Sequence, residues 1–349
     1  MSSTRSATAS PVSPDLSATH RVGLGCMNLS HAYGVPPDEA AGIALLNRAL
    51  DLGYNHLDTA ALYGFGANET LLGKAVMQRR NEFFLASKCG LFKGPDGKRA
   101  VNGRPEVLRQ TCDDALQRLG TEHIDLYYLH RWDKNVPIEE SVGALADLKK
   151  AGKIGAIGLS EVSAETLRKA HREYPIAAVQ TEYSLWTRNP EIAVLDACRE
   201  LGTVFVAFSP LGRGVLSDAL LEMESLPAND LRHQMPRFQA EHYATNCQRV
   251  DAVQALAREQ GCTTAQLALA WLLHQDPALV VIPGTTSLQH LSENVQANEI
   301  HLSAEMLARL DAALNQHNVS GPRYNAATQT EIDTEEFGDS GQSSSNCSN

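Results

Sequence analysis

The chain has 349 residues, of which 43% are hydrophobic and 20% are charged, so it holds enough apolar material for a globular core. Its formal net charge of −11 lacks the basic excess that nucleic-acid-binding surfaces need, so nucleic acid is not expected as a partner. The sequence has no run of about 18 apolar residues, and its Ser/Thr/Pro-rich start has no apolar signal-peptide segment. Neither a membrane span nor secretion is therefore expected.

Residues 1–20 show no hydrophobic period and are expected to form a disordered N-terminal tail. From residue 21 onward, short apolar runs alternate with amphipathic segments, which is typical of repeated strand–helix units. Eight strands are predicted at Val22–Gly25, Tyr54–Asp58, Phe83–Ser87, Ile124–Leu129, Ile154–Leu159, Ala177–Thr181, Val204–Phe208 and Leu279–Ile282. Helices are predicted at Asp38–Leu52, Asn68–Met77, Arg104–Leu119, Ile138–Ala151, Ser163–Glu173, Glu191–Leu201, Thr263–Gln275 and Leu288–Ala297.

Eight strands that are each followed by a helix predict an α/β fold, a (β/α)8 TIM barrel. Glycines at 53, 120 and 202 stand where helices have to stop, since glycine tolerates the left-handed conformation found there. Two segments do not fit the repeat, a long loop at 214–240 and an additional C-terminal helix at 306–315. Long loops of this kind usually shape the mouth of a barrel. The barrel domain is expected to span 21–326, and a disordered acidic and Ser-rich tail 327–349.

The cysteine and histidine patterns give no sign of a metal site or of disulfide chemistry. No C-x-x-C pair occurs among the seven cysteines, and the twelve histidines lack H-x-x-x-H spacing. Reduced thiols, a cytoplasmic location and no metal are therefore expected. The seven cysteines are Cys26, Cys89, Cys112, Cys198, Cys247, Cys262 and Cys347.

Ionisable residues follow three neighbouring strands at the point where each strand ends, which is where barrels carry their catalytic groups. Asp58 ends the second predicted strand and Tyr63 lies in the loop after it, Lys88 ends the third, and His130 ends the fourth. Each residue taken singly has a structural explanation, such as capping a turn or packing a ring. Together they predict one catalytic site.

The four side chains suit the reduction of a carbonyl group by hydride transfer. Hydride addition to a carbonyl carbon needs a proton donor at the developing alkoxide, and the phenol of Tyr63 is expected to serve. Lys88, kept charged by Asp58, is expected to lower the pKa of that phenol. His130 is expected to orient the carbonyl oxygen by a hydrogen bond.

Several motifs in order make the sequence resemble the aldo-keto reductase family over about residues 21–314. They are GYNHLDTAALYG, FFLASKCG, YYLHRWD, KIGAIGLSE, AAVQTEYS, FSPLGRG and VIPGTTSLQHLSEN. The resemblance implies the barrel fold, a catalytic tetrad of Asp58, Tyr63, Lys88 and His130, and NADPH as the cofactor, with NADH possible. The strand-five GLSE motif is similar to a subgroup of reductases with a broad carbonyl range.

The resemblance also implies the cofactor-binding residues. Ser160 and Gln180 match positions that contact the nicotinamide carboxamide, and Phe208 matches an aromatic residue on which the nicotinamide ring stacks. The pyrophosphate loop corresponds to Ser209, Leu211, Gly212 and Arg213. The adenosine end corresponds to Gly284, Thr285, Ser287, His290, Glu293 and Asn294.

Two positions depart from the family pattern. Glu161 follows the strand-five serine where many members have asparagine, so contact with the carboxamide is expected to differ. The stretch TTSLQHL at 285–291 offers only His290 as a cation where NADPH-specific members have Lys or Arg, which predicts a modest preference for NADPH. A small carbonyl substrate is expected to contact the apolar and aromatic candidates Met27, Tyr33, Phe92, Trp132 and Trp186.

Two alternatives stay open on the sequence. An NAD-dependent alcohol or sugar dehydrogenase would run the same chemistry toward oxidation. A nucleotide-binding regulatory subunit, as some relatives of the family are, would bind the cofactor and a partner protein with little turnover.

Overall fold

Eight parallel strands form a closed barrel in the computed structural model, which describes residues 16, 19–30, 32–94 and 97–338. The sheet order is β1-β2-β3-β6-β7-β8-β9-β10, and a parallel bridge between Val22 and Val281 joins the last strand to the first. The strands are β1 (Leu24–Gly25), β2 (His56–Asp58), β3 (Phe84–Cys89), β6 (Ile124–Leu129), β7 (Ile154–Ser160), β8 (Ala178–Glu182), β9 (Val204–Phe208) and β10 (Val280–Val281). The predicted TIM barrel is confirmed.

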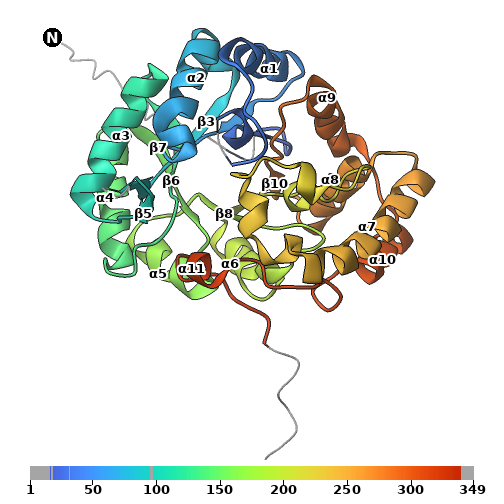
Figure 1. Cartoon of the computed structure of the whole chain (residues 1–349). Coiled ribbons are helices and arrows are strands. Elements are labelled where there is room, and N and C mark those ends of the chain that lie inside the picture. Colours follow the sequence, from blue (N-terminus) through green and yellow to red (C-terminus); the bar gives the residue numbers. More distant parts are fainter. Residues whose placement is uncertain (1–15, 17–18, 31, 95–96, 339–349) are drawn as a thin grey trace, which may run out of the picture.

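Helices surround the strands as a ring (Figure 1). They are α1 (Glu39–Asp51), α2 (Ala67–Val76), α3 (Pro105–Leu119), α4 (Ile138–Lys150), α5 (Ala164–Glu173), α6 (Val194–Leu201), α7 (Ala240–Gln260), α8 (Thr264–Gln275), α9 (Leu288–Gln296), α10 (Ala304–Ala313) and α11 (Ala326–Gln329). The expected glycine stops are present, because Gly120 and Gly202 end α3 and α6 with φ of 69° and 66°. Side-chain caps begin several helices, as Ser163 does for α5 by accepting from the Thr166 amide.

Side chains from alternating strand positions fill the barrel interior. Phe84, Leu126, Tyr128 and Val206 belong to this inner cluster, which is separate from the larger apolar layer between strands and helices. The ring of Tyr128 occupies the place where a side chain at 158 would lie, since a Cβ there would meet that ring at 2.3 Å. Gly158 is therefore required on β7, and the filled interior leaves the carboxyl ends of the strands as the place for a site.

A hairpin, the helix α7 and the short helix α11 were not predicted from the sequence. The hairpin of β4 (Leu91–Lys93) and β5 (Arg99–Val101) follows β3, and α7 covers 21 residues where only the preceding loop was expected. The buried face of α7 includes the polar Asn246, whose amide donates to the carbonyls of Arg237 and Ser320. That polar residue interrupts the apolar period of the helix, which explains why the pattern was weak.

The C-terminal boundary of the ordered chain was predicted too early. Residues 327–338, expected to be disordered, lie against the barrel, and Ile332 is 3% exposed. Asp333 accepts hydrogen bonds from the Ser163 amide and hydroxyl, and Glu335 accepts from the Ala164 amide. Carboxylates at the start of α5 satisfy free N–H groups and face the positive end of the helix dipole. The rest of this tail, 339–349, and nearly all of residues 1–20 lie outside the described residues.

Candidate active site at the carboxyl end of the barrel

A buried ion pair lies where β2 and β3 end. Asp58 is the last residue of β2, and Lys88 lies two residues beyond its register partner on β3, so the parallel pairing brings the two side chains together. The Lys88 ammonium is fully buried, pairs with the Asp58 carboxylate and donates to the Thr59 carbonyl at 2.8 Å. The other Asp58 oxygen accepts from the Gln180 amide at 2.8 Å. The ends of three strands, β2, β3 and β8, thus fix the position of one ammonium group.

Tyr63 and His130 complete the group of four side chains expected from the sequence. Tyr63 begins a short turn of helix after β2 and places its hydroxyl 3.3 Å from the Lys88 nitrogen. The ring of His130 meets the Tyr63 ring edge-on, with 5.9 Å between centroids. Tyr63 and His130 are each 8% exposed. The structure therefore brings together all four residues predicted from separate strand ends.

The electrostatics of this group differ from the expectation in one respect. Burial raises the pKa of Tyr63, and the nearby Lys88 opposes this rise without reversing it, so the predicted lowering is not found. Burial alone would lower the pKa of Lys88, but Asp58 and Tyr63 outweigh it and raise that pKa. Lys88 is consequently an ammonium and Tyr63 a neutral phenol near neutral pH.

A cavity of about 570 Å³ opens beside these residues, within the size range of small-molecule sites. Its walls include Asp58, Tyr63 and His130, and most of the cofactor residues implied by the resemblance. The latter are Ser160, Gln180, Phe208, Ser209, Leu211, Arg213, Gly284, Thr285 and His290. Met27 and Tyr33, two of the expected substrate residues, also line it.

Several expected residues do not line the cavity. Among the cofactor candidates these are Gly212, Ser287, Glu293 and Asn294. Ser287 instead caps α9, and Asn294 is 2% exposed with a side-chain oxygen that has no partner among the described residues. Phe92, Trp132 and Trp186 likewise lie outside the lining. Trp186 packs against Phe238, and the Trp132 nitrogen donates to the Val136 carbonyl.

The loop at 214–240 reaches the segment after β1, as its length suggested. The Leu231 amide donates to the Ala32 carbonyl at 3.0 Å, and Asp230 accepts from the Gly34 amide at 2.7 Å. The Arg232 guanidinium lies over the Tyr33 ring at 5.2 Å. Leu221, Leu231, Arg232, Gln234 and Met235 from this loop line the cavity. The loop therefore forms part of the mouth of the site.

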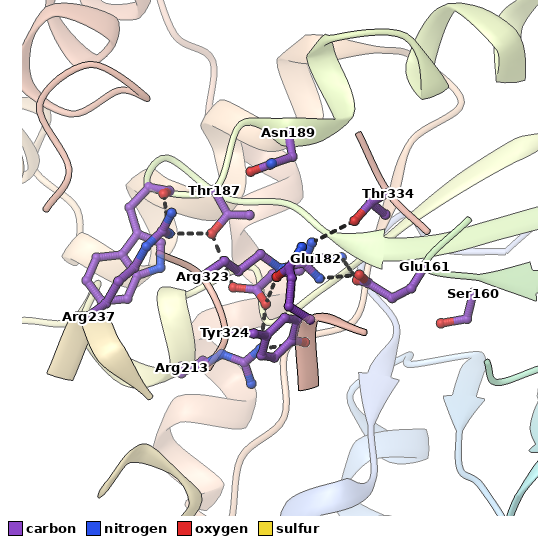
Figure 2. A network of polar contacts seen from close by, with 12 residues as sticks. Ser160, Glu161, Glu182, Thr187, Asn189, Arg213, Arg237, Arg323, Tyr324 and Thr334 are labelled. Carbon is purple, nitrogen blue, oxygen red and sulfur yellow. Dashed lines mark hydrogen bonds and ion pairs between the residues drawn. The ribbon is translucent and has the colours of Figure 1, made fainter. Parts of the chain in front are cut away.

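A second buried ionic group lies at the same end of the barrel (Figure 2). Arg323, from the C-terminal segment, pairs with both Glu161 and Glu182, and Glu182 also pairs with Arg213. Burial alone would raise the pKa of Glu182, but Arg213 and Arg323 outweigh it and lower that pKa to about 2. We call Glu161, Glu182, Arg213 and Arg323 the Arg–Glu cluster.

The departure from the family pattern at residue 161 has a structural explanation. Glu161 has φ of 56°, in the left-handed region that costs a non-glycine residue roughly 1–2 kcal/mol. Its carboxylate accepts from the Glu182 amide at 2.9 Å and pairs with Arg323, and it is not part of the cavity lining. Glu161 therefore contacts the C-terminal segment, and its backbone amide donates to the Gln180 carbonyl at 3.1 Å.

Sequence reasoning missed Glu182 and Arg323 of this cluster and several cavity residues, Arg131 among them. Glu182 ends β8 and could have been found by the strand-end rule that found Asp58. Arg323 had no local signal, because its partners depend on the path of the chain after α10. Arg131 follows His130 directly and lines the cavity, but an arginine after a strand end is too common to single out.

No group of three or more His, Cys, Asp or Glu side chains among the described residues is arranged to hold a metal ion. Within the same residues, no helix is both long and apolar enough to cross a membrane.

Comparisons with known proteins place this geometry in a family. The model of the aldo/keto reductase family matches residues 21–315. A probable aldo-keto reductase from Glycine max is 44% identical over 87% of this chain and 88% of its own length. The glycerol dehydrogenase of Gluconobacter oxydans superposes with a TM-score of 0.79 at 30% identity, over 87% of this chain and 94% of its own.

A third relative was solved with a nucleotide. The aldo-keto reductase of Klebsiella pneumoniae in complex with NADPH superposes with a TM-score of 0.66 at 25% identity, over 87% of this chain and 94% of its own. The family match includes the four clustered residues and most of the cavity walls, and only Tyr324, Asn325 and Thr328 of the lining lie beyond it. The chain therefore belongs to the aldo/keto reductase family.

Proposed function

We propose that the protein is an NADPH-dependent oxidoreductase that reduces an aldehyde or ketone to an alcohol, with Tyr63 as the proton donor. One observation carries the proposal. The Tyr63 hydroxyl lies 3.3 Å from an ammonium that Asp58 keeps charged, and it faces a cavity of ligand size. A buried phenol beside a fixed cation is suited to keep its proton until a base, such as the developing alkoxide of the substrate, lies next to it.

The raised pKa of Tyr63 favours the reducing direction. A neutral phenol holds the proton that an alkoxide needs, and Lys88 stabilises the phenolate that is left after transfer. His130, at the edge of the same ring, is placed to donate a hydrogen bond to the carbonyl oxygen. Asp58 and Gln180 act indirectly, because they hold the ammonium and its partner carboxylate in place.

The cavity walls fit a nicotinamide cofactor. Ser160, Gln180 and Phe208 line the cavity, where they offer polar and flat partners for a carboxamide and an aromatic ring, and Gln180 also donates to Asp58 beside Lys88. Ser209 and Arg213 have positive φ, which turns the backbone of the loop after β9 at the cavity wall. At the expected adenosine end, Gly284, Thr285 and His290 line the cavity. When bound, NADPH supplies the hydride to the carbonyl carbon.

The NADPH complex of the Klebsiella pneumoniae relative supports this choice of cofactor. The similarity to a glycerol dehydrogenase favours a second candidate, oxidation of a polyol or alcohol with the same residues. Both directions use the same proton on Tyr63. The substrate that is converted and the ratio of reduced to oxidised cofactor therefore distinguish reduction from oxidation.

Product analysis under both cofactors tests the proposal. We expect loss of nicotinamide absorbance with NADPH and an aldehyde or ketone, and slower or no alcohol oxidation with NADP. An enone should give the unsaturated alcohol, because His130 favours attack at the carbonyl. No turnover in either direction, with nucleotide still bound, would favour a regulatory nucleotide-binding role and overturn the proposal.

A further inference from the structure

The cavity is basic although the whole chain is acidic. Its walls carry four arginines and a single carboxylate, Asp58, which already pairs with Lys88. Three of the arginines have carboxylate partners of their own: Arg99 pairs with Glu331, Arg213 with Glu182 and Arg232 with Asp230. Among the described residues, Arg131 forms no ion pair with a carboxylate, and its hydrogen bonds go to the His130 carbonyl and the Ser160 hydroxyl. One positive charge in the wall of the site is thus uncompensated.

Arg131 lies at the reacting end of the cavity. It follows His130 in the chain, and after Lys88 its charge also opposes the rise in the pKa of Tyr63. The guanidinium donates from one nitrogen to the His130 carbonyl at 2.6 Å and to the Ser160 hydroxyl at 3.2 Å. Arg131 is only 6% exposed, and its Nε has no partner in the described part of the chain.

Two neutral oxygens orient this guanidinium but do not neutralise it. Removing an unpaired charge from water is costly, so buried arginines are normally paired with a carboxylate or phosphate. A purely structural link between the ends of β6 and β7 could be made by a neutral amide at lower cost. The position and the missing counter-charge therefore point to an anion that arrives with the ligand.

We propose that Arg131 binds a carboxylate of the substrate, so that the preferred substrates are short oxo acids. The inference rests on the proposed carbonyl reduction. The carbonyl carbon accepts the hydride, its oxygen accepts the proton of Tyr63, and the carboxylate is unchanged through the reaction. A carboxylate matches the planar guanidinium and forms charge-assisted hydrogen bonds with it. Because Arg131 and His130 are consecutive, the carboxylate lies only a few atoms from the carbonyl.

Matched acid and amide substrates test this proposal on the unmodified enzyme. Succinic semialdehyde and pyruvate are compared with their amides, which keep the size and lose the charge. We expect kcat/KM to be about tenfold to hundredfold higher for the acids, mainly through KM, because charge-assisted bonds to Arg131 are lost with the amides. Equal values for acid and amide, or a preference for the amide, would overturn the proposal.

Variants separate substrate binding from a structural role. In Arg131→Met the ratio of kcat/KM for acids to kcat/KM for amides should fall to about one, and Arg131→Lys should keep part of the preference for acids. Arg99→Met, which removes a cavity arginine that already has a carboxylate, should keep the wild-type ratio. An equal loss for acid and amide substrates in both Arg131 variants would show a structural role and contradict the proposal.

Failure of the proposed role of Arg131 can be told apart from failure of the proposed function. If uncharged aldehydes are reduced but acids are not preferred, the carbonyl reduction stands and the role of Arg131 fails. If no carbonyl compound of either kind is reduced, the proposed function itself fails.

Discussion

Two buried ionic groups lie at the same end of the barrel, and they differ in what their charges can do. The tetrad of Asp58, Tyr63, Lys88 and His130 borders the cavity and includes a neutral phenol with a transferable proton. In the Arg–Glu cluster the carboxylates and guanidiniums neutralise each other, and Glu161 faces away from the cavity lining. The tetrad is suited to proton transfer, whereas the Arg–Glu cluster joins the C-terminal segment to the barrel.

The largest effect that distinguishes the groups is expected from Lys88→Met. Removing the ammonium leaves the Tyr63 phenolate without its stabilising charge, so turnover should fall by about 10² to 10⁴, the range expected of acid–base catalysis. Steady-state kinetics with saturating NADPH measure this. Lys74→Met removes an exposed lysine paired with Glu39 and should keep wild-type turnover. A similar loss in both variants would show that the effect is not specific to the buried ammonium.

Arg323→Met should act on stability first. It leaves two buried carboxylates, Glu161 and Glu182, without a shared partner, and breaking a buried pair typically costs about 3–5 kcal/mol of unfolding free energy. Urea unfolding measures the loss, and the exposed Arg309→Met, which breaks a pair with Glu259, should lose about 1 kcal/mol or less. Adding Glu161→Gln to Arg323→Met should recover part of the loss. Wild-type stability of the single variant would remove the distinction between the groups.

His56, which belongs to neither ionic group, should make the stability of the fold depend on pH. Burial lowers the pKa of His56 from 6.5 to about 4, so the unfolded chain binds a proton that the folded chain excludes. Stability contributed by the neutral ring is present above pH 6.5 and is lost as the pH falls toward 4. We expect a loss of about 2 kcal/mol between pH 7 and pH 5. In His56→Gln this part of the slope should vanish, and an unchanged slope would assign the dependence to other residues.

The smallest effect concerns cofactor choice. His290 lines the cavity and is exposed, so an arginine there should meet the 2′-phosphate of NADPH while remaining in contact with water. His290→Arg should strengthen NADPH binding by roughly threefold to tenfold and leave NADH binding unchanged. Fluorescence titration of both cofactors into both proteins measures it. Equal changes for NADPH and NADH would place residue 290 away from the 2′-phosphate.

The two groups also differ in how far the sequence predicts them. Asp58 and Lys88 lie at the ends of strands and His130 directly follows one, so once the barrel is predicted their side chains have to share one edge of the sheet. Arg323 follows no periodic element, and its contact with Glu161 depends on a chain path that no local pattern encodes. The same reason explains the early boundary at 326, since Asp333 and Glu335 find their partners only at the start of α5.

The pKa of Tyr63 could not be predicted from residue types alone. The sequence shows a lysine that stabilises the phenolate, but not the burial that outweighs it. Likewise, Trp186 and Phe92 belong to residue types that often contact substrates, and only the packing shows that they lie outside the cavity lining.

Turnover and cofactor affinity of Tyr63→Phe test the central claim most directly, because the substitution removes one hydroxyl and no charge. We predict a fall in kcat of about 10² to 10⁴ with an NADPH dissociation constant near that of wild type. Tyr54→Phe is the matched control, since it deletes another buried phenol hydroxyl, which donates to the Leu291 carbonyl at 2.8 Å. It should keep wild-type kcat. Near-normal turnover in Tyr63→Phe would contradict the assignment of Tyr63 as the proton donor.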